Sequence, residues 1–140
     1  MTKSTDPKVL LLQAAQRLEA IEAAREGFEA FCRWVYPHRK LAKHHLELID
    51  VLDRLEKRTL TNEAGDVVYR LMVNLPPRHA KSECCTVLFP AYVICRRPLR
   101  RVMSACYGDD LAKKFGTDIR MVMEGACITP KCWGSLSAFI

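Results

Sequence analysis

The sequence has no run of about 18 apolar residues, and this absence argues against a membrane-spanning helix. Its longest mostly apolar stretch, Cys84–Cys95, is interrupted by Thr86 and Pro90 and is more typical of a buried helix. No apolar segment follows the N-terminal residues MTKSTDPK, so no secretory signal is expected. The chain is therefore predicted to remain in the cytoplasm.

The seven cysteines form no CxxC pair, and their odd number and irregular spacing argue against a disulfide framework. Zinc sites usually need such pairs, so no metal cluster is expected from cysteine. We expect the thiols to be reduced and mostly buried, because a free cysteine behaves as a small hydrophobic residue.

The charge is unevenly distributed. The net charge is +6, and residues 71–140 contain 10 Lys and Arg against 5 Asp and Glu. The densest basic segment is RRPLRR, with Arg96, Arg97, Arg100 and Arg101. A phosphate-rich partner and a solvated, arginine-rich turn both remain open as explanations of this segment.

Apolar spacing predicts an α/β chain. Helices are expected over residues 8–26, 28–36, 44–58, 81–95 and 109–124, from apolar positions at helical intervals and from their end signals. The first of these carries Leu11, Ala14, Leu18 and Ile21 at helical spacing. Two short apolar segments, 67–74 and 101–106, are predicted to be strands. Strand, helix and strand in this order form a βαβ unit, which builds a parallel sheet flanked by helices. The predicted organisation is an N-terminal helical region (1–66), a P-loop βαβ part of an ATPase domain (67–124) and a divergent tail (125–140).

The residues between the first predicted strand and its helix have the spacing of a Walker A loop, GxxxxGK[ST]. They read Leu75-Pro-Pro-Arg-His-Ala-Lys-Ser82, with neither glycine present. In such a loop Lys81 would lie between the β- and γ-phosphates, and Ser82 would offer its hydroxyl to Mg²⁺. The amide groups around His79, Ala80 and Glu83 would face phosphate oxygens. A proline-rich turn with an incidental Lys-Ser pair is the alternative.

Three segments resemble the large terminase subunits of tailed phages. They are RLMVNLPPRHAKSE (Arg70–Glu83), FCRWVYPHRKLAKHHLELIDVLDRLEKR (Phe31–Arg58) and MSACYGDDLAKKFGTDIR (Met103–Arg120). The family's loop often reads PPRHGKS, and the three matches follow the family's order. The resemblance implies a P-loop ATPase that uses ATP and Mg²⁺ to drive double-stranded DNA into a capsid. It also implies a small terminase subunit and a portal protein as partners, in the cytoplasm of a bacterial host.

The resemblance assigns roles to individual residues. Lys81 and Ser82 correspond to the phosphate and Mg²⁺ ligands, within a nucleotide-binding loop that includes Pro77, His79, Ala80 and Glu83. Arg78 would stabilise charge on the transferring phosphoryl group, because a guanidinium remains protonated; a surface role is the alternative. Trp34, Tyr36 and His44 would approach the nucleotide base, although an aromatic side chain near a turn more often belongs to the core. For Asp109 and Asp110, helix capping is preferred over a contact with DNA.

The sequence also departs from the family. Ala80 replaces a glycine whose lack of a Cβ lets the backbone approach phosphate. No apolar strand ending in Asp-Glu follows Ser82, and no carboxylate cluster for a nuclease is present. These departures predict a truncated or frame-shifted prophage product, or a fragment, that binds ATP weakly and does not hydrolyse it. A different P-loop translocase and a non-catalytic remnant that binds DNA or terminase partners remain as alternatives. Unpaired sheet edges would make the chain prone to aggregate or to form homo-oligomers.

Overall fold

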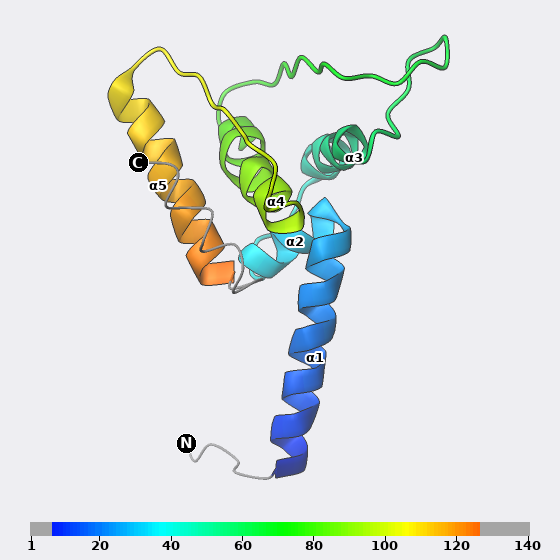
Figure 1. The fold of residues 1–140 in the computed structure, drawn as a ribbon, viewed down its shortest axis with the longest axis vertical. Helices are drawn as coiled ribbons and strands as arrows, with labels where there is room; N and C mark the ends of the chain where they lie inside the picture. Colours follow the sequence, from blue (N-terminus) through cyan, green and yellow to red (C-terminus); the bar gives the residue numbers. More distant parts are fainter. Residues whose placement is uncertain (1–6, 127–140) are drawn as a thin grey trace.

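Helices make up all the regular structure in the part of the chain that is described, residues 7–126 of the computed structural model (Figure 1). They are α1 (Pro7–Glu26), α2 (Phe28–Val35), α3 (Lys43–Lys57), the π-helix η1 (Glu83–Leu88), α4 (Phe89–Arg96) and α5 (Asp109–Ala126). Each helix predicted from apolar spacing is present, within about two residues of its expected ends. Gly27 separates α1 from α2, as a residue of low helix propensity is expected to do.

The predicted parallel sheet was wrong. Over residues 7–126 the structure contains no strand, and its single isolated bridge pairs Thr61 with Val67. The segments 67–74 and 101–106 are extended loops whose larger apolar side chains are exposed: Met72 by 84% and Met103 by 92%. A strand needs a neighbour for its backbone hydrogen bonds, and neither segment lies beside another strand. The α/β class is therefore replaced by an all-helical one for the described residues.

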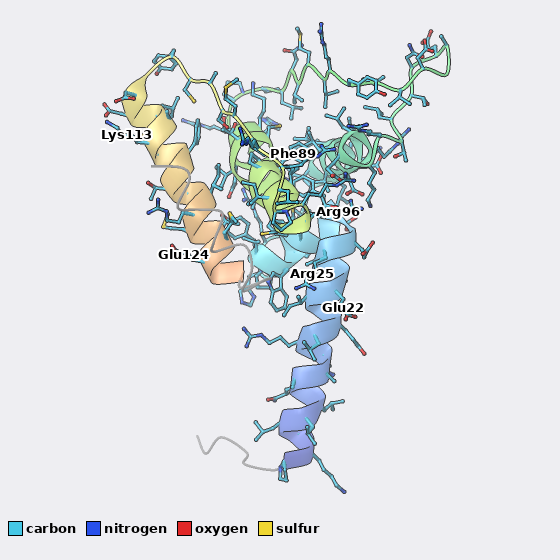
Figure 2. The ribbon with its side chains drawn as sticks, viewed as in Figure 1. Glu22, Arg25, Phe89, Arg96, Lys113 and Glu124 are labelled. Atoms are coloured by element: carbon cyan, nitrogen blue, oxygen red, sulfur yellow. The ribbon has the colours of Figure 1, made fainter. Side chains whose placement is uncertain are left out.

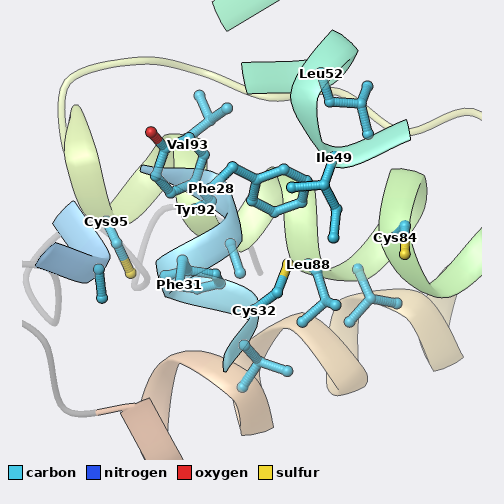
Figure 3. Close-up of a cluster of buried hydrophobic side chains, with 14 of the residues drawn as sticks. Phe28, Phe31, Cys32, Ile49, Leu52, Cys84, Leu88, Tyr92, Val93 and Cys95 are labelled. Carbon is cyan, nitrogen blue, oxygen red and sulfur yellow. The ribbon is translucent and has the colours of Figure 1, made fainter. Parts of the chain in front are cut away.

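The core is formed where α2, α3, η1, α4 and α5 meet (Figure 3). Phe28 and Phe31 of α2 lie against Tyr92 of α4, with ring centroids 5.1 and 5.6 Å from that of Tyr92. Ile49 of α3 and Leu88 of η1 close the cluster. The cluster contains residues that come before and after the loop Leu75–Ser82 in the sequence. The packing of α2 and α3 therefore fixes the position of the helix that follows the loop.

The helix after the loop begins with a widened turn. Residues Glu83–Leu88 form η1, and the amide of Phe89 donates to the carbonyl of Cys84, five residues earlier. The following residue, Pro90, has no amide hydrogen to donate to Thr86. The π-turn therefore ends where proline interrupts the ordinary helical ladder, a place where such turns are found.

A polar network joins α3 to α4 beside this core. The buried carboxylate of Glu56 accepts a hydrogen bond of 2.8 Å from Arg96, and Arg97 Nε lies 2.9 Å from its other oxygen. The Tyr92 hydroxyl donates to Asp53 over 2.9 Å. Two of the four arginines in RRPLRR, Arg96 and Arg97, thus pair with Glu56. The other two, Arg100 and Arg101, are exposed.

Two further expectations concern thiols and membranes. Cys32, Cys84, Cys85, Cys95 and Cys106 are reduced thiols, and the first, second and fourth of these are buried, as predicted. Cys127 and Cys132, like the predicted tail 125–140 from residue 127 onward, lie outside the described residues. Among the described helices, none combines the length and the apolar character needed to cross a bilayer.

Candidate phosphate-binding loop

The loop Leu75–Ser82 leaves an extended segment, turns at Pro77 and Arg78, and enters a helix at Lys81. Its backbone has two residues in the left-handed region, Arg78 with φ 65° and Ala80 with φ 53°. Alanine pays a steric cost there that glycine avoids. Ala80 occupies the position of the second glycine in a Walker A loop. Its backbone therefore has a left-handed conformation that glycine adopts more easily than alanine.

The Lys81 side chain folds back over the loop. Its ammonium group donates to the carbonyl oxygen of Leu75 at 3.5 Å, a weak hydrogen bond between residues six positions apart. The side chain is partly buried. Because the bond is weak, an anion placed over the loop could replace the carbonyl as the partner of the ammonium.

The first helical amide groups complete the loop. Cys84 N–H donates to the Ala80 carbonyl over 2.9 Å, so the helical ladder starts at Ala80. Amides in the first turn of a helix have no carbonyl partner within it and carry partial positive charge. The hydroxyl group of Ser82 belongs to an exposed residue of this turn. Lysine, amides and hydroxyl are thus the groups with which this segment can bind phosphate and Mg²⁺.

Three histidine rings gather against the loop. The ring centroid of His44 lies 4.0 Å from that of His45 and 5.0 Å from that of His79. His45 Nδ1 accepts a 3.1 Å hydrogen bond from the amide of Ala42, which caps α3. Burial lowers the pKa of His45 because it disfavours a charged imidazole, and His44 and Arg39 lower it further by repelling a nearby positive charge. The neutral imidazole of His45 therefore caps the start of α3, and the neighbouring His44 ring contacts His79 of the loop.

Glu83 is tied to the segment before α3. Its carboxylate forms an ion pair with Arg39, whose guanidinium also lies 5.6 Å from the ring centroid of Tyr36. Burial and the Glu83 carboxylate raise the pKa of the Tyr36 hydroxyl. The side chain of Glu83 is thus occupied by protein groups, and only its backbone amide remains available for a phosphate.

A groove of about 620 Å³ lies between α2, α5 and η1, the helical segment that follows the loop. Trp34 and Tyr36 line it from α2 and its C-terminal cap, Glu83 and Val87 from η1, and Phe115 from α5. The structure therefore brings two of the three residues predicted to contact a base into one groove. It separates the third, His44, which lies against His79 instead.

The remaining predicted residues lie at the surface. Pro77 and Arg78 are exposed at the turn, and the His79 ring nitrogen Nδ1 lies 2.9 Å from the Pro77 carbonyl oxygen. Sequence analysis missed the roles of Arg39 and His45. The basic segment HRK and the adjacent histidines were visible signals, but Glu83 lies 44 residues after Arg39, and His79 lies 35 residues after His44.

No protein-family model, curated protein or solved structure that was compared with the chain matches it. Within residues 7–126, no group of three or more His, Cys, Asp or Glu side chains is arranged to hold a metal ion.

Proposed function

We propose that the segment Leu75–Ser82 binds the phosphates of Mg²⁺·ATP, and that the chain is an N-terminal part of a terminase-like DNA-packaging motor. The observation that supports this most is the folding of Lys81 across a loop that leads directly into a helix. A point charge on a flexible stem, beside unpaired amide groups, is the chemistry that P-loops use.

The wider part of the proposal comes from the terminase resemblance. Double-stranded DNA, the small terminase subunit and the portal protein are its proposed partners, and the bacterial host cytoplasm is its proposed location. Arg78, exposed at the loop's turn, is the residue proposed to face the γ-phosphate. The helical fold limits the proposal to binding by the loop and its neighbours, since the described residues provide no sheet behind it.

A purely DNA-binding remnant has less support. Two arginines of the most basic segment, Arg96 and Arg97, are engaged by the buried carboxylate of Glu56. Phosphate contacts on DNA need cations that are free to neutralise it. The segment therefore offers fewer such cations than the sequence suggests.

Titration of the full chain with a fluorescent ATP analogue, with and without Mg²⁺, tests the proposal. Lys81→Ala should weaken binding at least ten-fold, and Ser82→Ala should remove most of the Mg²⁺ dependence. Arg17→Ala is the matched control, because it removes a cation from an exposed position of α1, a helix that extends away from the loop (Figure 1). Equal affinities for the wild type and Lys81→Ala would overturn the assignment.

A further inference from the structure

Residues 99–107 form an extended segment between α4 and α5, the yellow trace in Figure 1. Within residues 7–126, no hydrogen bond joins the backbone of residues 101–106 to another part of the chain. Water must therefore satisfy these amide and carbonyl groups, and the backbone of another polypeptide could replace that water. An extended backbone with unpaired groups is the feature to which a peptide adds as a further strand.

The segment is held in place at both ends. At its start, Arg96 and Arg97 form ion pairs with a buried carboxylate of α3, and the Arg100 amide donates to the Arg97 carbonyl over 2.9 Å. Figure 2 shows the segment running from the end of α4, beside Arg96, to the start of α5, near Lys113. Between these ends Val102 packs against the core. A segment that is already extended and anchored loses little conformational entropy when a partner binds.

One face of the segment points away from the body. The odd-numbered residues from 101 to 107 are all exposed, Met103 by 92% and Tyr107 by 99%, whereas Val102 and Cys106 are half-buried. Leu99, in the turn before the extended residues, is 97% exposed. In a strand that rests one face on a core, the backbone groups point sideways, between the buried and the exposed side chains. Both edges of the segment, and a partly apolar outer face, are thus available to a partner.

The charge of the segment indicates which kind of peptide would bind. Arg100 and Arg101 are exposed, and neither side chain forms an ion pair in the part of the chain that the structure describes. Positions 84–108 of the sequence contain no Asp or Glu, and Asp109 and Asp110 follow the far end of the segment. Positive charge is therefore concentrated at the start of the segment. A peptide with acidic side chains at the matching end complements it.

Other partners fit these features less well. Residues 69–74 form a second extended segment, but its charged residue is Arg70. Pairing of the two segments between copies of this chain would therefore bring like charges together. A nucleic acid needs cations along its length, and residues 99–107 offer two at one end. Neither alternative explains the positive charge and the unpaired backbone together.

We propose that residues 99–107 bind an extended acidic peptide of another protein. The peptide adds as a strand along the backbone of residues 101–106, with its carboxylates beside Arg100 and Arg101. This interaction does not depend on nucleotide binding by the loop Leu75–Ser82. Lys81→Ala should therefore bind the peptide as the wild type does.

Fluorescence anisotropy of labelled synthetic peptides, titrated with the full chain, measures this binding. The probes are Asp-Glu-Val-Thr-Val-Thr-Val and its reverse, because the direction of the added strand decides which end meets the arginines. One of the two should bind, and its analogue with Asn and Gln in place of Asp and Glu should bind about five-fold more weakly, as expected for two exposed ion pairs. Arg100→Ala combined with Arg101→Ala should weaken binding to a similar extent. Arg17→Ala combined with Lys40→Ala, which also removes two exposed cations, should leave it unchanged.

Three outcomes of this titration would overturn the proposal. The first is the absence of binding by both peptides up to millimolar concentrations of the chain. The second is equal affinity for the acidic peptide and its neutral analogue. The third is tighter binding of a labelled single-stranded DNA than of either peptide, lost in the variant without Arg100 and Arg101, which would show a nucleic-acid site instead.

Proline substitutions test the pairing of the backbones. Successive amide groups of an extended segment point to opposite edges, so Ser104→Pro and Ala105→Pro each remove a donor from a different edge. Both side chains are exposed and neither amide has a partner within residues 7–126, so both variants should keep the circular dichroism spectrum of the wild type. The variant that changes the bound edge should bind at least about five-fold more weakly, and the other about as well as the wild type. Equal affinities of the two variants would refute strand addition.

Discussion

Replacing Glu56 by alanine removes the carboxylate that holds α3 to α4. Only 1% of the Glu56 side chain is exposed, and its two oxygens face Arg96 and Arg97 at 2.8 and 2.9 Å. The variant leaves both guanidinium groups without this partner. It also opens a space beside the hydrogen bond that Arg96 donates to the Tyr92 hydroxyl. The change therefore tests whether this buried acid, which no apolar pattern predicts, stabilises the helical body.

The loss of stability expected for Glu56→Ala depends on how exposed its partners Arg96 and Arg97 are. Removing one member of a fully buried ion pair costs about 3–5 kcal/mol. Here the arginine side chains are 23% and 45% exposed, so each recovers part of its hydration when the carboxylate is gone. We therefore expect Glu56→Ala to lower the free energy of unfolding by about 2–3 kcal/mol, close to the value of a hydrogen bond to a charged group. Glu56→Gln keeps the shape and one acceptor, and should lose about 1–2 kcal/mol.

Urea titration followed by circular dichroism at 222 nm measures these differences, at a protein concentration held constant because association contributes to stability. Glu47→Ala is the control on the same helix. Its carboxylate is exposed and lies 3.8 Å from Lys43, so its loss should cost less than about 0.5 kcal/mol. A double-mutant cycle with Arg96→Ala should give a coupling free energy of about 1 kcal/mol or more. If Glu56→Ala unfolds within 0.5 kcal/mol of the wild type, the reasoning that places this ion pair at the centre of the α3–α4 contact is refuted.

Three further changes have expected outcomes. Ala80→Gly should raise the free energy of unfolding by up to about 1 kcal/mol, because it relieves the left-handed backbone at φ 53° by more than it adds to the entropy of the unfolded chain; a loss of stability in the same urea titration would contradict this. His45 has a lowered pKa, so the unfolded chain binds its proton first as the solution is acidified. The free energy of unfolding should therefore fall as the pH drops through and below 6.5, and less steeply in His45→Ala; parallel pH profiles would contradict the role of His45 as the cap of α3. Burial raises the pKa of the Cys84 thiol from 9.0 to about 11, so the unfolded chain loses this proton first and stability should decline between these pH values. Cys84→Ala should flatten that decline, and in the wild type Cys84 should react with a thiol reagent at pH 8 more slowly than the partly exposed Cys106; equal rates would show that Cys84 is accessible.

The positions of the helices could be predicted from sequence because their information is local. Helical hydrogen bonds join residues four apart, and apolar side chains at intervals of three and four mark the buried face. The prediction placed α3 over residues 44–58, and the structure has it at Lys43–Lys57 with Leu48, Ile49 and Leu52 buried. The Walker-like spacing of Leu75–Ser82 was also visible, and the structure places a turn and a helix start at this segment.

Strands could not be predicted in the same way, because a strand exists only with a neighbour. The β-branched and apolar residues of 67–74 satisfy a strand's local preferences, but the hydrogen bonds that define it must come from another segment. In the helical structure no described segment supplies them, and Tyr69 and Met72 stand exposed. Local composition therefore indicated an element that the tertiary structure does not contain.

The partners of the candidate site were decided by packing alone. Glu83 forms an ion pair with Arg39, and the His79 ring contacts His44, only because η1 packs on the same core as α2 and α3. The spacing of Lys81 and Ser82 was determined by the sequence, but the fold of the Lys81 side chain onto Leu75 depends on how the extended segment approaches the helix. Contacts between residues tens of positions apart arise from the burial of apolar faces against each other, and no periodicity within one helix specifies which faces will meet.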